Sequence, residues 1–140
     1  MNEGPSSIGS RREAREEALG FLYEMEVTGD SLQAALKAKP LPPKDYALEM
    51  IEGVAGQVTA YDKRIGAHLM DWTVDRLAVV DRVLARMATW ELCERKDVPT
   101  GVVLSEAVEL ASQYSGSESP RFLNGVLRAV ANETRGAEDG

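Results

Sequence analysis

Residues 98–127 read VPTGVVLSEAVELASQYSGSESPRFLNGVL, and this stretch decides the fold. In its first half the apolar residues recur at intervals of three and four, which is the spacing of one buried face of an α-helix. The polar run SGSES interrupts that spacing, and Ser119 followed by Pro120 suits the start of another helix. The stretch therefore predicts two helices joined by a short turn, with Thr100 and Ser119 as their N-caps.

The same helical spacing continues toward the N-terminus. Ser10 and Glu13 form the pattern of a capping box, and Gly29 suits the end of the helix that follows. The predicted helices cover residues 11–28, a short segment from Asp30 or Ser31 through Lys39, residues 44–70, 79–96, 100–114 and the segment from 119 onward. No alternating strand pattern competes, so we expect an all-α fold of about six to seven helices. Residues 1–10 and 135–140 lack an apolar face and are expected to be flexible tails.

Composition limits the classes of function. A chain of 140 residues fits one domain, and its single cysteine, Cys93, cannot form an intrachain disulfide. We therefore expect a cytoplasmic protein, and no apolar run is long enough to span a membrane. The net charge of −7 repels polyanions and argues against a general nucleic-acid coat. Any RNA binding must come from a local patch.

Charges are segregated on the first predicted helix. At about 100° per residue, Arg11, Arg12 and Arg15 fall on one edge, off the apolar arc, while Glu13, Glu16, Glu17 and Glu24 fall on the opposite edge. Arginine binds phosphate through two parallel hydrogen bonds and stacks on unpaired bases, and Tyr23 could add an aromatic surface beside this edge. The alternative is that these arginines simply pair with neighbouring glutamates.

The sequence offers little for catalysis. His68 is the only histidine, no nucleophile stands beside a base, and no metal-ligand cluster has usable spacing. Glu106 and Glu109 have no partner acid, base or cleft, so they indicate a solvated helix face. Trp72 and Trp90 flank helices and are interpreted as packing anchors. We expect a protein that is not an enzyme and that has no cofactor or metal.

Three segments resemble the NusB family of transcription antitermination factors. They are the arginine-rich segment RREAREEALGFLYEMEVTG, the central segment DWTVDRLAVVDRVLARMATWEL, and the stretch 98–127, which is similar to the family block with "NEAVELA" and "FVNGVL". Together they cover about four-fifths of the chain in the family's order. The family block places Asn124-Gly125 inside the last helix, although this dipeptide alone favours a hairpin turn. We expect the helix, with Gly125 at a close helix contact and Asn124 bonded to a buried backbone group.

The resemblance implies a fold and a function. It implies one NusB-like domain over residues 11–134, made of two small helical bundle subdomains at about 11–71 and 72–134. It also implies a non-enzymatic factor that binds single-stranded boxA-type RNA together with the ribosomal protein NusE. Such a factor acts on the transcription elongation complex and supports ribosomal RNA transcription.

Site residues are carried over one by one. The resemblance places RNA contacts at Arg11, Arg12, Arg15, Ser119, Arg121 and Phe122. It places NusE contacts at Tyr23 and Asp81. Two departures predict weaker RNA binding: Glu13 lies where relatives often carry a basic residue, and Ser105 replaces the usual asparagine.

Two other readings stay open at this stage. In the first, the chain is an acidic helical adaptor or dimer that binds a basic protein partner and has little intrinsic RNA binding. In the second, it is the RNA-binding domain of a ribosomal RNA methyltransferase of the same fold. The second reading is disfavoured, because a sequence of 140 residues leaves no room for a catalytic domain.

Overall fold

A computed structural model describes residues 4–136, and within that range it contains helices and no strand. The all-α expectation is therefore confirmed, as is the expected number of helices. The elements are α1 (Gly4–Thr28), α2 (Leu32–Lys37), α3 (Asp45–Ala55), α4 (Val58–Gly66), the 3₁₀ turn η1 (Val74–Arg76), α5 (Val79–Glu94), α6 (Thr100–Tyr114) and α7 (Ser119–Arg135).

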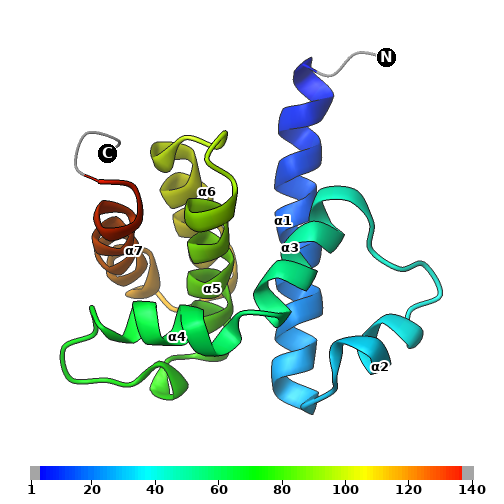
Figure 1. The fold of residues 1–140 in the computed structure, drawn as a ribbon, viewed down its shortest axis with the longest axis horizontal. Helices are drawn as coiled ribbons and strands as arrows, with labels where there is room; N and C mark the ends of the chain where they lie inside the picture. The colour runs from blue at the N-terminus through cyan, green and yellow to red at the C-terminus, as the bar shows by residue number, and fades with distance from the viewer. Residues whose placement is uncertain (1–3, 137–140) are drawn as a thin grey trace.

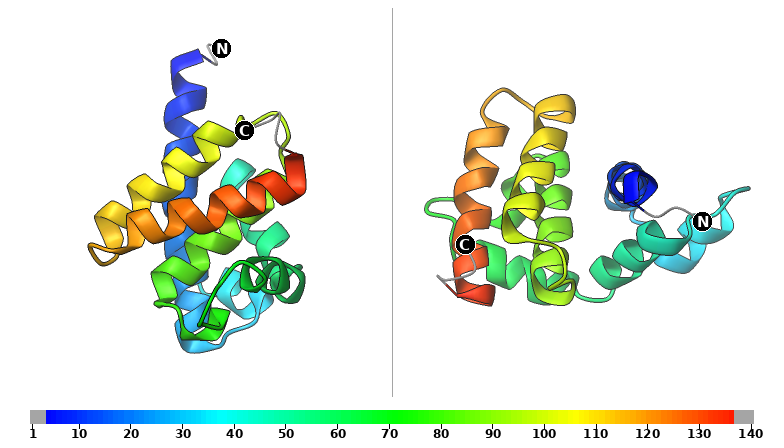
Figure 2. Two further views of the ribbon diagram at one scale, coloured as in Figure 1. Left: turned by 90° about the vertical axis from the view of Figure 1, so that its left-hand side faces the viewer. Right: turned by 90° about the horizontal axis from the view of Figure 1, so that it is seen from above.

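The helices form two groups around a central helix. In Figure 1, α1 stands on one side with α2 and α3 beside it, while α5, α6 and α7 stand on the other side above α4. Figure 2 shows that α6 and α7 form an antiparallel pair. Helix α5 contacts both groups, because it packs against α1 and α3 as well as α4, α6 and α7. It therefore positions every surface discussed below.

One continuous apolar core joins the two groups. It contains side chains from α1 and from α3 through α7, and those most completely enclosed include Met50, Ile51, Ile65, Leu84, Leu92, Leu123 and Leu127. Burying each such side chain contributes about 1.5–3 kcal/mol. The apolar residues at three- and four-residue spacing are thus the ones that face the core, as the sequence predicts.

Helix α3 comes unusually close to α5 at Gly53. A Cβ atom added to Gly53 would collide with the indole ring of Trp90, so only glycine allows this approach. The Tyr46 ring packs edge-on against the same indole, with 5.7 Å between the ring centroids. Trp90 is therefore the packing anchor that the sequence predicts.

The predicted long helix over residues 44–70 is wrong. The structure breaks it at Gly56 and Gln57, where the backbone of Gln57 leaves the helical region with φ −133° and ψ 24°. The two resulting helices have different neighbours, since α3 packs against α1 and α5 whereas α4 packs against α5 and α7. A single straight helix could not pack against both groups. Gly56 at the break has a low helix propensity, so interrupting the helix there costs little free energy.

Helix starts were predicted with mixed success. Ser31 is the N-cap of α2, because its hydroxyl accepts a hydrogen bond from the Ala34 amide at 3.1 Å. Helix α1 instead begins at Gly4, so Ser10 lies inside the helix and is not its cap. Thr100 and Ser119 are first helical residues rather than N-caps. Their hydroxyls are used in tertiary hydrogen bonds, which the sequence does not show.

The C-terminal helix extends to Arg135, beyond the predicted end of the domain at 134. The Arg135 guanidinium donates hydrogen bonds to the carbonyl oxygens of Leu92 at 3.0 Å and Val98 at 2.7 Å, which tie the helix end to the α5–α6 connection. Residues 4–10, predicted as part of the N-terminal tail, lie within α1, whereas residues 1–3 and 137–140 of the predicted tails lie outside the described residues.

Asn124 and Gly125 lie within α7, so the helical prediction for this dipeptide is confirmed. The expected reason is wrong. Both residues are exposed, and nothing lies within 4 Å of a Cβ atom added to Gly125. No helix approaches closely there.

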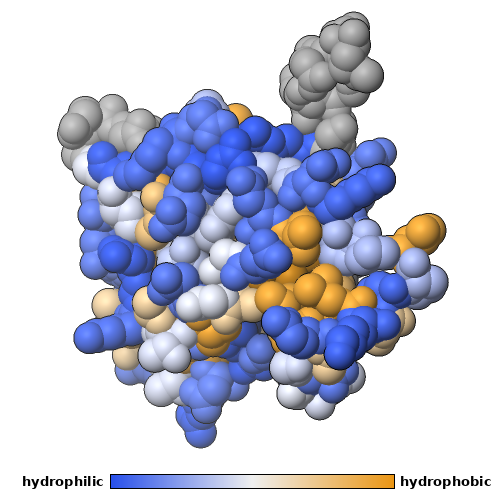
Figure 3. All heavy atoms as spheres, turned by 45° about the vertical axis from the view of Figure 1, so that its right-hand side comes forward, coloured by the Kyte–Doolittle hydropathy of each residue, from blue (hydrophilic) through white to orange (hydrophobic). Residues whose placement is uncertain are grey.

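The face seen in Figure 3 is mostly polar, with one broad apolar area right of its centre. Val27, near the end of α1, and Leu41, in the α2–α3 connection, are exposed apolar side chains. None of the described helices is both long and apolar enough to cross a bilayer.

Candidate nucleic-acid and partner interface

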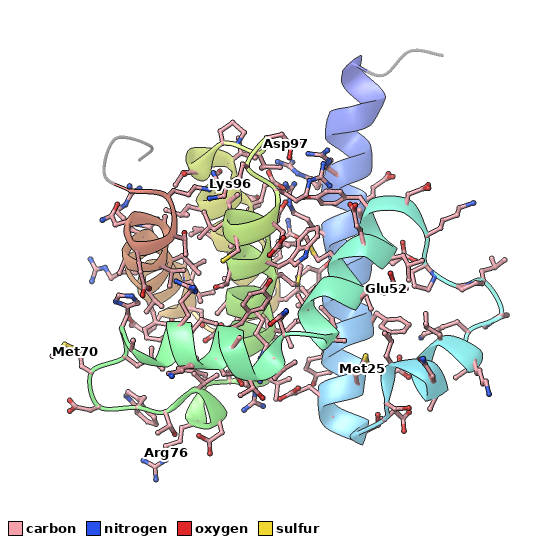
Figure 4. The ribbon with its side chains drawn as sticks, viewed as in Figure 1. Met25, Glu52, Met70, Arg76, Lys96 and Asp97 are labelled. Carbon is pink, nitrogen blue, oxygen red and sulfur yellow. The ribbon has the colours of Figure 1, made fainter. Side chains whose placement is uncertain are left out.

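The three arginines of α1 all meet carboxylates from other elements. Arg12 remains 58% exposed and binds Glu106 of α6 at 2.7 Å. Arg11 lies 3.5 Å from Asp97, in the loop between α5 and α6 that Figure 4 shows beside the upper part of α1. The structure thus supports the pairing alternative, but the partners lie across the fold rather than on α1 itself.

Arg15 does not lie on an exposed edge, and the prediction that it sits off the core is wrong. Its side chain is 6% exposed and that of Glu91 is 3% exposed, with the two charged groups 2.8 Å apart. The Arg15 guanidinium donates to both carboxylate oxygens of Glu91, and the Tyr46 hydroxyl donates to the same carboxylate at 2.6 Å. This contact joins α1, α3 and α5, so Arg15 holds the helices together.

The Tyr46 ring contacts two arginine side chains. The Arg11 guanidinium lies 4.3 Å from the centre of its ring and that of Arg95 lies 4.8 Å away. Burial raises the pKa of the Tyr46 phenol, and the neighbouring Glu91 carboxylate raises it further. The hydroxyl therefore stays protonated and donates to Glu91. Sequence reasoning missed Tyr46 and Asp97, because no spacing along one helix connects them to α1.

An aromatic hollow lies between α1, α5 and α6. Tyr23 and Tyr114 are 42% and 54% exposed, and together with Leu19, Gly20 and Val80 they line a cavity of about 400 Å³. Exposed aromatic rings around such a hollow are typical of protein interfaces. Tyr23, carried over as a partner contact, is thus available for one.

Asp81 and Ser119 are brought together. Asp81 is 7% exposed, and its carboxylate accepts hydrogen bonds from Ser115 at 2.7 Å and from Ser119 at 2.8 Å. These bonds fix the start of α7 against the first turn of α5. The resemblance placed Asp81 at the partner surface and Ser119 at the RNA surface. In the structure the two residues are hydrogen-bonded to each other.

A second hollow opens beside this bond. Asp81, Ser119 and Phe122 line it together with Trp72, Arg76 and Glu118, and Arg121 is exposed next to Phe122. Trp72 is 55% exposed, so its interpretation as a packing anchor is wrong. The predicted RNA residues of α7 are thus close to one another. A third hollow is lined by Arg11, Arg15 and Glu106, and none of the predicted RNA residues of α7 lines it.

The family is decided by comparison with known proteins. The NusB family model matches residues 12–132, which is most of the chain. The chain belongs to the NusB family. Among its relatives, transcription antitermination protein NusB of Kineococcus radiotolerans is 40% identical over 89% of this chain and 94% of its own. That of Salinispora tropica is 41% identical over 87% of this chain and 95% of its own.

Solved structures agree with this NusB assignment. NusB of T. maritima superposes with a TM-score of 0.80 at 32% identity, covering 88% of this chain and 91% of its own. A chain from a complex of antitermination factors NusB and NusE with dsRNA superposes at 0.75 with 28% identity, covering 88% of this chain and 96% of its own. The resemblance found in the sequence is therefore confirmed, as is the NusB-like fold.

Proposed function

We propose that this NusB-family protein is a transcription antitermination factor that binds boxA-type single-stranded RNA together with NusE. The family match and the similarity to a NusB–NusE complex with RNA support this role. The proposal places the protein in the cytoplasm, on the transcription elongation complex of ribosomal RNA operons, and it includes no catalytic step. No group of three or more potential metal-ligating side chains occurs within the described part of the chain.

One observation carries the proposal: an arginine-lined hollow and an aromatic hollow take side chains from the same two helices, α1 and α6. Arg11, Arg15 and Glu106 line the first, and Tyr23 and Tyr114 line the second. The Trp72 hollow is lined by residues of α5 and α7 instead, including Asp81 and Phe122. We assign NusE to the aromatic hollow, which has the exposed tyrosines, and RNA to the arginines at the other two hollows.

The ion pairs modify the expected roles of the arginines. The ion pairs of Arg11 with Asp97 and of Arg12 with Glu106 compete with phosphate for these guanidinium groups, whereas Arg121 is exposed on α7. This competition supports weak RNA binding by the free protein, as expected from Glu13 and Ser105. With about three phosphate contacts, the log–log slope of affinity against salt is expected near −2, from ~0.7 per phosphate on a single strand.

The test is fluorescence anisotropy of a boxA-like RNA and of a scrambled RNA, with and without NusE, at two salt concentrations. Selective binding that NusE strengthens and salt weakens is the expected result. Arg12→Gln should weaken it and Tyr23→Ala should reduce the effect of NusE. Arg64→Gln is the control, because Arg64 of α4 also makes a surface ion pair, with Glu133 of α7.

Two outcomes contradict parts of the proposal. Absence of selectivity in every condition would reject the RNA role and leave a helical adaptor for a protein partner. Equal losses for Arg12→Gln and Arg64→Gln would show that general charge, rather than the α1 edge, attracts the RNA.

A further inference from the structure

We infer that the hollow beside Trp72 holds one unpaired base of the bound RNA, stacked on the indole ring, and that it prefers a base with an exocyclic amino group. This inference rests on the proposed function, because it concerns how the same RNA is recognised. It adds Trp72 and Arg76 to the RNA surface, neither of which was a candidate from the sequence.

The size and lining of the hollow suit a single base. Its volume is about 250 Å³, which is below the range of roughly 300–1,000 Å³ typical of pockets for larger ligands. Trp72 lines one side and Phe122 contributes a second aromatic ring from α7. Trp72 keeps 55% of its surface exposed, so the indole has area left to cover. Stacking on exposed aromatic rings is the usual way that proteins hold unpaired bases.

Positive charge at this hollow is free to meet the RNA backbone. Arg76 lies 5.7 Å from the centre of the Trp72 ring, and Figure 4 shows it projecting outward at the edge of the molecule. Within the described range 4–136, neither Arg76 nor Arg121 forms an ion pair, in contrast to the three arginines of α1. A phosphate on either side of the stacked base can therefore bind without displacing a carboxylate.

The polar atoms inside the hollow favour an amino group. Apart from the cationic Arg76, its charged lining consists of Asp81 and Glu118, and ionised carboxylates only accept hydrogen bonds. Ser115 and Ser119 each donate one bond to Asp81, which fixes its orientation and leaves further acceptor positions on its oxygens. Carboxylates pair with the amino group of cytosine, and adenine carries an equivalent group, whereas uracil presents a carbonyl there.

The test follows RNA binding and tryptophan emission in the same titration, using the full chain with NusE and a dye-labelled boxA-like RNA. Trp72 and Trp90 are the two tryptophans of this chain, and Trp90 is buried. RNA should quench the emission of the wild-type protein, and Trp72→Phe should abolish that quenching while keeping affinity within about twofold. Trp72→Ala should weaken binding by about 5- to 140-fold, the range of one lost base stack.

Controls separate this site from the rest of the RNA surface. Leu41→Ala removes an exposed apolar side chain from the α2–α3 connection and should leave both signals unchanged. Arg76→Gln should weaken binding, with circular dichroism unchanged. BoxA-like RNAs in which one cytosine, adenine or guanine at a time is replaced by uracil should include one that still binds but no longer quenches Trp72.

The outcomes distinguish the inference from the proposed function. If RNA binds selectively with NusE but Trp72→Ala keeps full affinity and no quenching occurs, the base site is wrong and the antitermination role stands. Equal quenching by every one of these uracil-substituted RNAs would overturn the amino preference. Failure of any RNA to bind the wild-type protein with NusE would remove both proposals.

Discussion

Replacing Arg15 with alanine should destabilise the fold rather than act only on RNA binding. The substitution leaves the Glu91 carboxylate buried, with the Tyr46 hydroxyl as its one remaining partner among the hydrogen bonds described above. Removing one member of a buried ion pair costs about 3–5 kcal/mol, because the other charge loses its compensation. This is a large share of the roughly 5–15 kcal/mol that stabilises an ordinary domain.

The companion variant is Arg15→Met combined with Glu91→Met. It removes both charges and fills the space with apolar side chains, so it is expected to lie within about 1 kcal/mol of the wild type. Urea denaturation followed by circular dichroism measures the difference. The melting temperature of Arg15→Ala should fall by roughly 10–20 °C, while that of the double variant should stay near the wild type.

Two results would refute this reasoning. If Arg15→Ala lowered the free energy of unfolding by less than about 1 kcal/mol, water would have to reach Glu91, as it does in an exposed ion pair. A double variant as unstable as Arg15→Ala would show that the pair itself contributes net stability, rather than that an unpaired charge is costly.

Three further predictions concern other parts of the fold. Gly53→Ala should cost about 1–3 kcal/mol through overpacking, whereas Gly125→Ala, in open space on α7, should stabilise by about 0.5–1 kcal/mol; urea denaturation compares them. Burial raises the pKa of Tyr61 to about 12, so its neutral form favours the folded state. Stability should therefore fall as pH rises from about 10, the unfolded pKa, through 12, and Tyr61→Phe should lessen the fall in melting temperature. Ser119→Ala should cost about 1–3 kcal/mol in the same denaturation assay, because a hydrogen bond to a buried carboxylate is lost.

The sequence alone determined the all-α class, most helix bounds and the family. Helix periodicity is written in the order of apolar residues, and side chains such as Leu84 and Leu127 must face the core whatever the arrangement of the helices. The sequence also predicted the N-cap role of Ser31 and the helix-ending role of Gly29, whose φ is 78°. Both features depend only on neighbouring residues.

Only the tertiary structure decided which charges are available. A helical wheel places Arg15 at an angle but cannot show that α5 covers that angle and brings Glu91 to it. Likewise, no local pattern predicts that Asp81 is enclosed by two serines or that Trp72 is left exposed. Burial and ion pairing depend on side chains contributed by distant parts of the chain. The sequence therefore determined the family and the helices, whereas packing determined which of its arginines and aromatic rings can meet RNA.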